Sequence, residues 1–197
     1  IIAQKSASQL HNNCSGKHAG MLALAKQLGG KISGYTNIDH PVQKIINEYI
    51  SKISETEDLH CQTDGCSAPT PFFTLETIAK MFQRLASGHG VELNRVFNAM
   101  ASHPLLVGGT DNFDSSFIEA LDGRGITKVG GESVRGISIR TNKHGPIGIA
   151  VKVLDGNFRA LPIATMKLLE HLEILEEKEQ KQLSHYSTKI LKNHNNL

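Results

Sequence analysis

The residues that could do chemistry are concentrated between positions 11 and 21. This run reads HNNCSGKHAGM and places the thiol of Cys14, the hydroxyl of Ser15, the amine of Lys17 and the imidazole of His18 close together. Apolar residues at helical spacing follow, so the run is predicted to lie where a loop enters a helix. The first turn of a helix lowers the pKa of a cysteine and favours its thiolate. Cys14 and Lys17 are three positions apart and can face the same side of that turn.

The same residue types also allow a purely structural interpretation. Ser15 would then cap the helix, and Cys14 would pack inward. Lys17 and His18 would be solvated on the surface. The local sequence leaves both interpretations open.

A second group of reactive residues lies at positions 60–69, which read HCQTDGCSAP. The Cys61-x4-Cys66 spacing, preceded by a histidine, is a weak signal for zinc, because four-ligand sites usually have closer pairs of ligands. The alternative is a turn-rich loop with buried thiols. Residues 55–71 are predicted to form a loop, and long ordered loops are often functional.

A third candidate is Lys128, which lies in the predicted strand Ile126 to Val129, just before Gly130 and Gly131. Glycines beside a strand let a ligand approach the backbone. In penicillin-recognising enzymes, a lysine on such a strand lies beside the catalytic serine. The alternative is an exposed strand lysine followed by a tight turn.

Composition excludes several classes of function. The 197 residues contain 21 Lys and Arg against 19 Asp and Glu, so the net charge of +2 gives no reason to expect nucleic acid or an anionic membrane as partner. No apolar run approaches the roughly 20 residues of a membrane span. Three cysteines, an odd number, argue against a disulfide framework and favour a reduced, cytoplasmic protein.

The elements that must position these residues follow from hydrophobic periodicity. Helical spacing gives way to alternation after Gly123, and one apolar helix follows, which predicts an α+β fold with helices packed on an antiparallel sheet. Asp114 is expected to cap one helix, and Thr74 another. Helices are predicted at about 19–28, 42–53, 75–86, 93–100, 114–121 and 162–174, and strands at about 126–129, 137–139 and 147–154. We expect a domain at 1–175 and a charged helical or frayed tail at 176–197.

Five motifs occur in an order that resembles one known family. They are the run at 11–21, Asp64-Gly65-Cys66-x-x-Pro69-Thr70, His103-Pro104 with Val107-x-Gly109, Lys128-Val129-Gly130-x-Glu132, and Gly148 to Val153 followed by Asp155-Gly156 and Arg159-Ala160. Together they resemble the L-asparaginase II family, which has a serine β-lactamase-like fold. The resemblance covers the C-terminal two-thirds of that family.

The resemblance implies hydrolysis of L-asparagine to L-aspartate and ammonia. It also implies a zinc ion held by Cys14, Lys17 and Cys66. A lysine ligand must be neutral, so bound zinc would displace its proton. The family's substrate contacts fall on His18 and Asp64. The strand lysine that partners a catalytic serine falls on Lys128, and family enzymes are often homodimers.

The sequence departs from the family in one essential feature. The family's nucleophile lies in a Ser-x-x-Lys motif, and no serine of this chain has a lysine three residues later. We expect the two catalytic serines to lie upstream of Ile1, so that the fold is incomplete at its N-terminus and these residues alone are inactive. Asn112 stands where an arginine is expected, and Ser133 replaces a glycine and could narrow the cleft beside Lys128. The alternatives are a catalytically dead zinc-binding remnant and an interaction domain.

Overall fold

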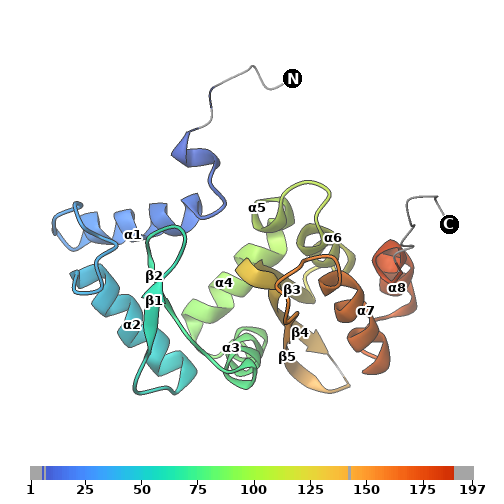
Figure 1. Ribbon diagram of the computed structural model, residues 1–197. Coiled ribbons are helices and arrows are strands. Elements are labelled where there is room, and N and C mark those ends of the chain that lie inside the picture. Colours follow the sequence, from blue (N-terminus) through green and yellow to red (C-terminus); the bar gives the residue numbers. More distant parts are fainter. Residues whose placement is uncertain (1–5, 7, 142, 189–197) are drawn as a thin grey trace. The chain divides into compact units, whose positions relative to one another are not determined.

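The computed structural model describes residues 6, 8–141 and 143–188 (Figure 1). The chain divides into two compact units, Ile1–Phe72 and Phe73–Leu197, and each is described by itself. Of the expected tail, positions 189–197 lie outside the described residues. No described helix has the length and apolar character needed to cross a membrane.

The first unit contains two α-helices and a small hairpin. It begins with a short 3-10 helix, Gln9–His11, and continues with α1 (Ser15–Gln27), α2 (Pro41–Ser54), β1 (Cys61–Thr63) and β2 (Pro69–Pro71). The two strands pair antiparallel, with Cys61 opposite Pro71 and Thr63 opposite Pro69. This hairpin occupies the segment predicted as a loop, because strands of three residues leave too little alternation to detect.

The core of the first unit is small. Four buried apolar side chains form it: Met21 and Ala25 from α1, Val42 from α2 and Ala68 from the hairpin. Pro41 opens α2 as expected, and the Nδ1 atom of His40 accepts a hydrogen bond of 3.2 Å from the backbone N–H of Val42. So few apolar residues provide little hydrophobic stabilisation, since that term scales with the buried area.

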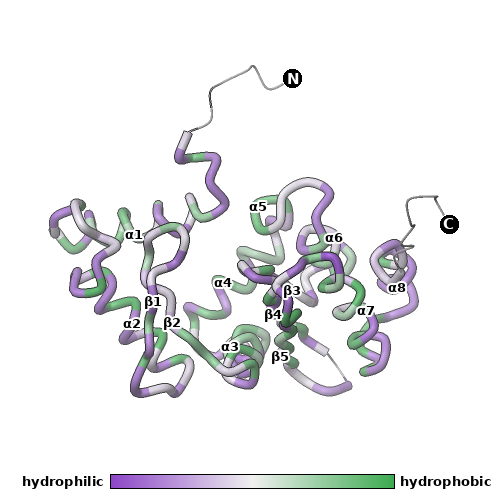
Figure 2. The backbone as a smooth tube through the Cα atoms, viewed as in Figure 1, coloured by the Kyte–Doolittle hydropathy of each residue, from purple (hydrophilic) through white to green (hydrophobic). Residues whose placement is uncertain are grey.

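The second unit is built around a three-stranded antiparallel sheet. The strands β3 (Gly125–Gly130), β4 (Val134–Thr141) and β5 (Gly145–Lys152) lie in the order β3-β4-β5, which confirms the predicted meander. Apolar residues are prominent along β4 and β5 (Figure 2). The unit's helices are α3 (Leu75–Ser87), α4 (Val91–Ser102), α5 (Pro104–Gly108), α6 (Phe113–Ala120), α7 (Leu161–His171) and α8 (Glu177–Leu183).

Helix α3 packs directly against β4 and β5. Two glycines on these strands allow the close approach. A Cβ atom at Gly136 would overlap the ring of Phe82, and one at Gly148 would overlap the backbone oxygen of Ala79. The backbone of α3 therefore lies directly on the sheet at Gly148, and the Phe82 ring of α3 lies on it at Gly136.

The helix ends test the capping predictions. The hydroxyl of Thr74 accepts a hydrogen bond of 3.1 Å from the N–H of Thr77, which confirms Thr74 as the cap of α3. The prediction that Asp114 caps α6 is wrong. Asn112 is the cap, and its side chain accepts from the N–H of Asp114 at 3.2 Å. Asp114 lies in the first turn of α6 and is fully buried. Its carboxylate accepts hydrogen bonds from residues of the sheet.

The C-terminal region forms two helices in place of one extended helix. Helix α7 ends at His171, and α8 packs against α6 with Leu183 buried in the core of the second unit. The described part of the expected tail thus contains a packed helix. The domain boundary between residues 175 and 176 stays a prediction. The chain is α+β, as the sequence predicted.

Candidate functional site

Two segments far apart in the sequence converge in the first unit. Cys14 and Lys17 come from the start of α1, and Asp64 and Cys66 come from the turn between β1 and β2. Ligand atoms of Cys14, Asp64 and Cys66 all lie within 4.8 Å of one another. The Nζ atom of Lys17 lies 3.1 Å from Oδ2 of Asp64, and the Sγ atom of Cys66 lies 3.5 Å from the same oxygen. We call these four residues the thiol cluster.

Backbone hydrogen bonds hold the turn that carries Asp64 and Cys66. The N–H of Asp64 donates to the carbonyl of Ala68 at 2.9 Å, and the N–H of Ser67 donates to the carbonyl of Asp64 at 2.8 Å. The Oδ1 atom of Asp64 accepts from the N–H of Gly65 at 2.7 Å, which leaves Oδ2 to face Lys17. The tight turn therefore fixes one thiol and one carboxylate side by side.

The other half of the cluster is fixed by the beginning of α1. Cys14 is the N-cap residue, and its backbone N–H donates to Oδ1 of Asn12 at 2.8 Å. Lys17 follows within the first helical turn, so its side chain can reach Asp64. The local alternative in which Lys17 is only solvated does not hold, although Lys17 and Asp64 remain about 40% exposed.

Charges within the cluster shift the pKa values of its members. Burial and the neighbouring thiol of Cys66 raise the pKa of Cys14, and they outweigh the lowering effect of Lys17. The expectation of a lowered pKa at Cys14 is therefore wrong, because burial, a second thiol and a carboxylate together raise it. Burial tends to lower the pKa of Lys17, but Asp64 and the thiols raise it overall. The hydrogen bond from Lys17 lowers the pKa of Asp64.

The donor set of the thiol cluster fits a zinc ion. Thiolate sulfur, carboxylate oxygen and neutral amine nitrogen can all bind zinc, and structural sites take four ligands in a tetrahedron. Sulfur and oxygen atoms within 4.8 Å of one another need only small side-chain adjustments to share one ion. Cys61 lies on β1 and is not part of this group among the described residues.

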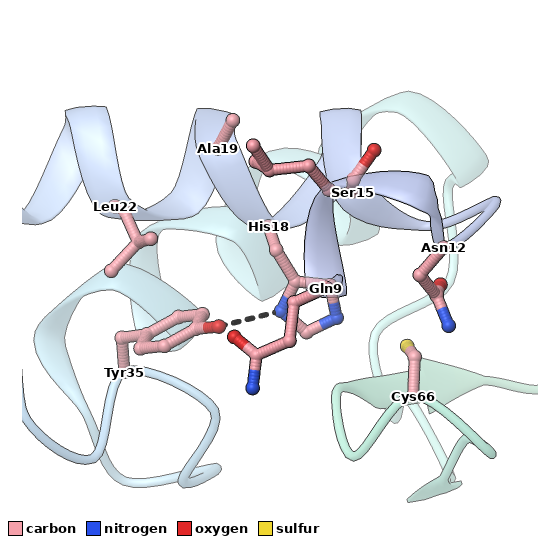
Figure 3. A pocket seen from close by; sticks show the side chains of 9 residues that line it. Gln9, Asn12, Ser15, His18, Ala19, Leu22, Tyr35 and Cys66 are labelled. Atoms are coloured by element: carbon pink, nitrogen blue, oxygen red, sulfur yellow. Dashed lines mark hydrogen bonds between the residues drawn. The ribbon is translucent and has the colours of Figure 1, made fainter. Parts of the chain in front are cut away.

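A pocket of about 360 Å³ lies beside the start of α1 (Figure 3). Cys66 points toward it from the hairpin, and His18 points toward it from α1. Its volume is within the range of pockets that bind small molecules. Its lining combines polar and apolar side chains: Gln9, Leu10, Asn12, Ser15, His18, Ala19, Leu22, Tyr35 and Cys66.

His18 is held by a residue that the sequence analysis did not select. The hydroxyl of Tyr35 lies 2.7 Å from Nδ1 of His18, and the two rings meet edge to face with centroids 5.6 Å apart. Gln43 fixes the backbone of Tyr35, since its Nε2 donates to the Tyr35 carbonyl at 2.8 Å. A lone tyrosine in a turn carries no local signal, so only the tertiary structure identifies it.

Lys128 belongs to the second unit, where it lies half exposed on β3, two residues before the end of the strand. Its Nζ donates to the carbonyl of Val129 at 2.9 Å and lies 3.9 Å from Oδ2 of Asp114. Asp114 also accepts from the N–H of Val129 at 2.8 Å and from Nη1 of Arg135 at 2.6 Å. Asp114 and Arg135 are both buried, so a fully desolvated ion pair anchors the strand end that carries Lys128.

The two departures from the family pattern have structural roles. Asn112 caps α6, as described above. The hydroxyl of Ser133 is buried and donates to the carbonyl of Asn157 at 3.1 Å. Ser133 therefore ties the end of the sheet to the segment that follows β5.

The structure thus brings five of the six predicted site residues into the first unit and places the sixth, Lys128, in the second.

A search of curated proteins found no match to this chain. The family model described as L-asparaginase II matches residues 1–197. That match agrees with the order of the five motifs along the chain, and this chain belongs to the L-asparaginase II family.

Proposed function

We propose that this chain carries the zinc and substrate-binding part of an enzyme that hydrolyses L-asparagine to L-aspartate and ammonia. The observation that carries the proposal is the convergence of Cys14, Lys17, Asp64 and Cys66 beside a pocket of small-molecule size. Membership of the L-asparaginase II family supports the class of reaction and a small-molecule substrate. A serine β-lactamase-like fold remains part of this proposal.

Cys14, Lys17 and Cys66 would hold the zinc ion. Both thiols and the amine must lose protons to bind, and the raised pKa values of Cys14 and Lys17 in the metal-free chain make that release part of the binding reaction. Bound zinc supplies a fixed positive charge and a cross-link between α1 and the hairpin. The cross-link would matter for a unit whose buried apolar core is this small.

A second donor set is supported by geometry. The carboxylate of Asp64 already lies within the group of possible ligand atoms, and its lowered pKa keeps it ionised. In this alternative Asp64 replaces Lys17 as the third protein ligand, and Lys17 neutralises the charge of the site. In the favoured set, Lys17 would bind zinc as a neutral amine and would no longer pair with Asp64. The Asp64 carboxylate would then be available to pair with the ammonium group of an amino acid.

The substrate would occupy the pocket beside α1. An amino acid presents an ammonium group, a carboxylate and a side-chain amide, and a selective pocket must offer a partner to each. Asp64, which lies 3.5 Å from the pocket-lining Cys66, would provide a carboxylate for the ammonium group, and His18 in the pocket lining would provide a ring nitrogen for an oxygen atom. The apolar side chains of Ala19 and Leu22 complete the lining.

Hydrolysis also requires a nucleophile and a group that accepts its proton. Lys128 would pair with a serine hydroxyl, as its motif implies. No serine of the 197 residues lies in a Ser-x-x-Lys motif. We therefore propose that these residues bind zinc and ligand but do not release ammonia from L-asparagine by themselves.

The test combines metal analysis with an activity measurement on the purified chain. We expect one bound zinc per chain, loss of that zinc in Cys14→Ala, and its retention in Cys61→Ser, the matched control outside the thiol cluster. With L-asparagine, we expect binding without ammonia release. Turnover that disappears in Cys14→Ala would contradict the need for an absent serine and direct attention to Cys14, Ser15 and Ser67.

Two other outcomes would decide between the alternatives. Zinc binding with no affinity for L-asparagine or L-aspartate would favour a zinc-stabilised interaction domain. Absence of zinc binding would contradict the metal site itself.

We further propose a reduced, cytoplasmic location, because the three cysteines are free thiols. A homodimer, or association with an N-terminal catalytic segment, is the assembly that the family suggests.

A further inference from the structure

We propose that Tyr35 is a positioning residue that fixes His18 as the tautomer with its proton on Nε2, so that His18 offers an N–H donor to an oxygen atom of the ligand. This inference rests on the proposed function only for the identity of the ligand. The hydrogen-bond geometry of the first unit carries the tautomer itself.

The Tyr35 hydroxyl is in place before any ligand binds. Gln43, which is 1% exposed, holds the Tyr35 backbone by the 2.8 Å bond to its carbonyl. The Tyr35 ring packs against the apolar core formed by α1, α2 and the hairpin. With both backbone and ring held, the hydroxyl has little freedom to leave its position 2.7 Å from Nδ1 of His18.

Counting donors and acceptors indicates which atom carries the proton. A phenol has one proton to donate, and among the described residues Nδ1 of His18 is the only hydrogen-bond partner of the Tyr35 hydroxyl. If Nδ1 accepts that proton, the neutral ring carries its own proton on Nε2. If Nδ1 were the donor, the phenol proton and the Nε2 lone pair would both lack a protein partner. The first arrangement satisfies more groups.

The Nε2 atom of His18 has no hydrogen-bond partner in the described part of the chain, and its ring lines the pocket (Figure 3). An unpaired N–H in a pocket selects ligands with an acceptor oxygen at that point, because burying it against an apolar group would leave the donor unsatisfied. The carboxylate or amide oxygen of an amino acid meets this requirement. His18 thus acts in binding as a donor and not as a general base.

The direct test is nitrogen-resolved NMR of the full chain with labelled histidine, with and without zinc. We expect Nε2 of His18 to carry the proton and the Tyr35 hydroxyl proton to correlate with Nδ1. In Tyr35→Phe we expect a mixture of both tautomers. The matched control is Tyr49→Phe, because Tyr49 is 43% exposed on α2 and does not line this pocket; there His18 should be unchanged.

Affinity for L-aspartate provides an independent readout. Tyr35→Phe should bind L-aspartate about 3- to 10-fold more weakly, the loss expected for one poorly oriented hydrogen bond. His18→Gln places an amide N–H near the position of Nε2 and should retain more affinity than His18→Ala. If Tyr35→Phe does not fold, the tautomer of the wild-type chain and this glutamine rescue still decide the question.

Three results would overturn the inference. The first is a proton on Nδ1 of His18 in the wild-type chain, and the second is the same Nε2–H tautomer with and without the Tyr35 hydroxyl. The third is an equal affinity of His18→Gln and His18→Ala for L-aspartate, in a chain that binds L-aspartate. The proposed function can fail separately. A chain that shows the expected tautomer and its loss in Tyr35→Phe, but binds no L-aspartate, would refute the ligand and leave the role of Tyr35 intact.

Discussion

At the scale of single residues, the thiol cluster shows how neighbours decide what a side chain can do. The start of a helix should favour a thiolate at Cys14, yet burial, the Cys66 thiol and the Asp64 carboxylate raise its pKa. A cation placed among these groups would reverse that balance, because it stabilises every deprotonated donor at once. Under the proposed function, the metal-free cluster would exchange its protons for a metal ion.

The identity of the third ligand can be tested by paired substitutions. We expect Lys17→Met to weaken zinc binding by about tenfold or more, and Asp64→Asn to weaken it less, because only the first removes a direct ligand in the favoured donor set. Competition with a chromogenic chelator measures both affinities. The opposite order would assign Asp64 as the ligand.

Zinc affinity should depend on pH with a defined sign. The raised pKa values of Cys14 and Lys17 mean that both groups still hold protons near neutrality. Protons compete with zinc for these atoms, so affinity should rise with pH by about tenfold per unit for each proton displaced. Chelator competition across neutral pH, with Cys61→Ser as control, measures the slope. An affinity independent of pH would contradict thiol and amine ligands.

At the scale of elements, the second unit depends on one buried ion pair between α6 and the sheet. Asp114 binds Arg135 and the backbone of Val129, and the Arg135 guanidinium lies 4.1 Å from the centroid of the Phe113 ring. The pair is fully desolvated, so its two members cannot be separated without leaving a buried charge unpaired. This contact determines where the end of β3, and hence Lys128, is held.

Substitution of Asp114 should therefore destabilise the second unit. We expect Asp114→Asn to lower the free energy of unfolding by about 3–5 kcal/mol, the usual cost of leaving a buried partner charge uncompensated. Asp155→Asn is the control, because Asp155 forms an exposed ion pair of 3.9 Å with Arg159 and should change stability by less than about 1 kcal/mol. Urea denaturation measures both. Equal effects would show that the buried pair contributes little.

The packing of α3 on the sheet can be tested at Gly148. We expect Gly148→Ala to cost about 1–3 kcal/mol, since the added methyl group would overlap the α3 backbone at Ala79. Gly131→Ala is the control, because no atom lies within 4 Å of the Cβ position there. Thermal unfolding followed by circular dichroism compares the two variants. A neutral Gly148→Ala would mean that α3 can move away from the sheet.

At the scale of the whole molecule, the two units differ in how they are stabilised. The second unit has an extended core with phenylalanines, isoleucines and leucines from α4, α6, α7, α8 and the sheet. Among its described residues, the first unit has four buried apolar side chains. A unit with so small a core gains stability from a metal cross-link more than one with a large core does.

Zinc should therefore stabilise the units unequally. We expect zinc at about 100 times its Kd to stabilise the first unit in the full chain by about 2.7 kcal/mol. An isolated fragment of residues 73–197 should unfold independently of zinc. Calorimetry of both proteins, with and without a chelator, measures the difference. A zinc-dependent transition in the fragment would place a metal site in the second unit and contradict the thiol cluster as the binding site.

Much of the local structure was determined by the sequence itself. Apolar periodicity predicted the helices that became α2, α3 and α4, and alternation predicted the three-stranded meander, because both patterns follow from the geometry of a single segment. Thr74 marks the beginning of α3 for the same reason. The order of five motifs was enough to predict the family, and the match over residues 1–197 confirmed it.

Tertiary structure alone decided which side chains of the site and of the buried ion pair contact one another. The local sequence around Cys14 and Cys66 carries no signal of their proximity, which only the family resemblance implied, because their contact depends on how α1 packs on the hairpin. Asp114 has the sequence pattern of a helix cap, yet the partner Arg135 on β4 makes it a buried ion-pair member. Tyr35 acquires its role only through the fold that brings it to His18. Local patterns report one segment at a time, whereas a site is formed by contacts between segments.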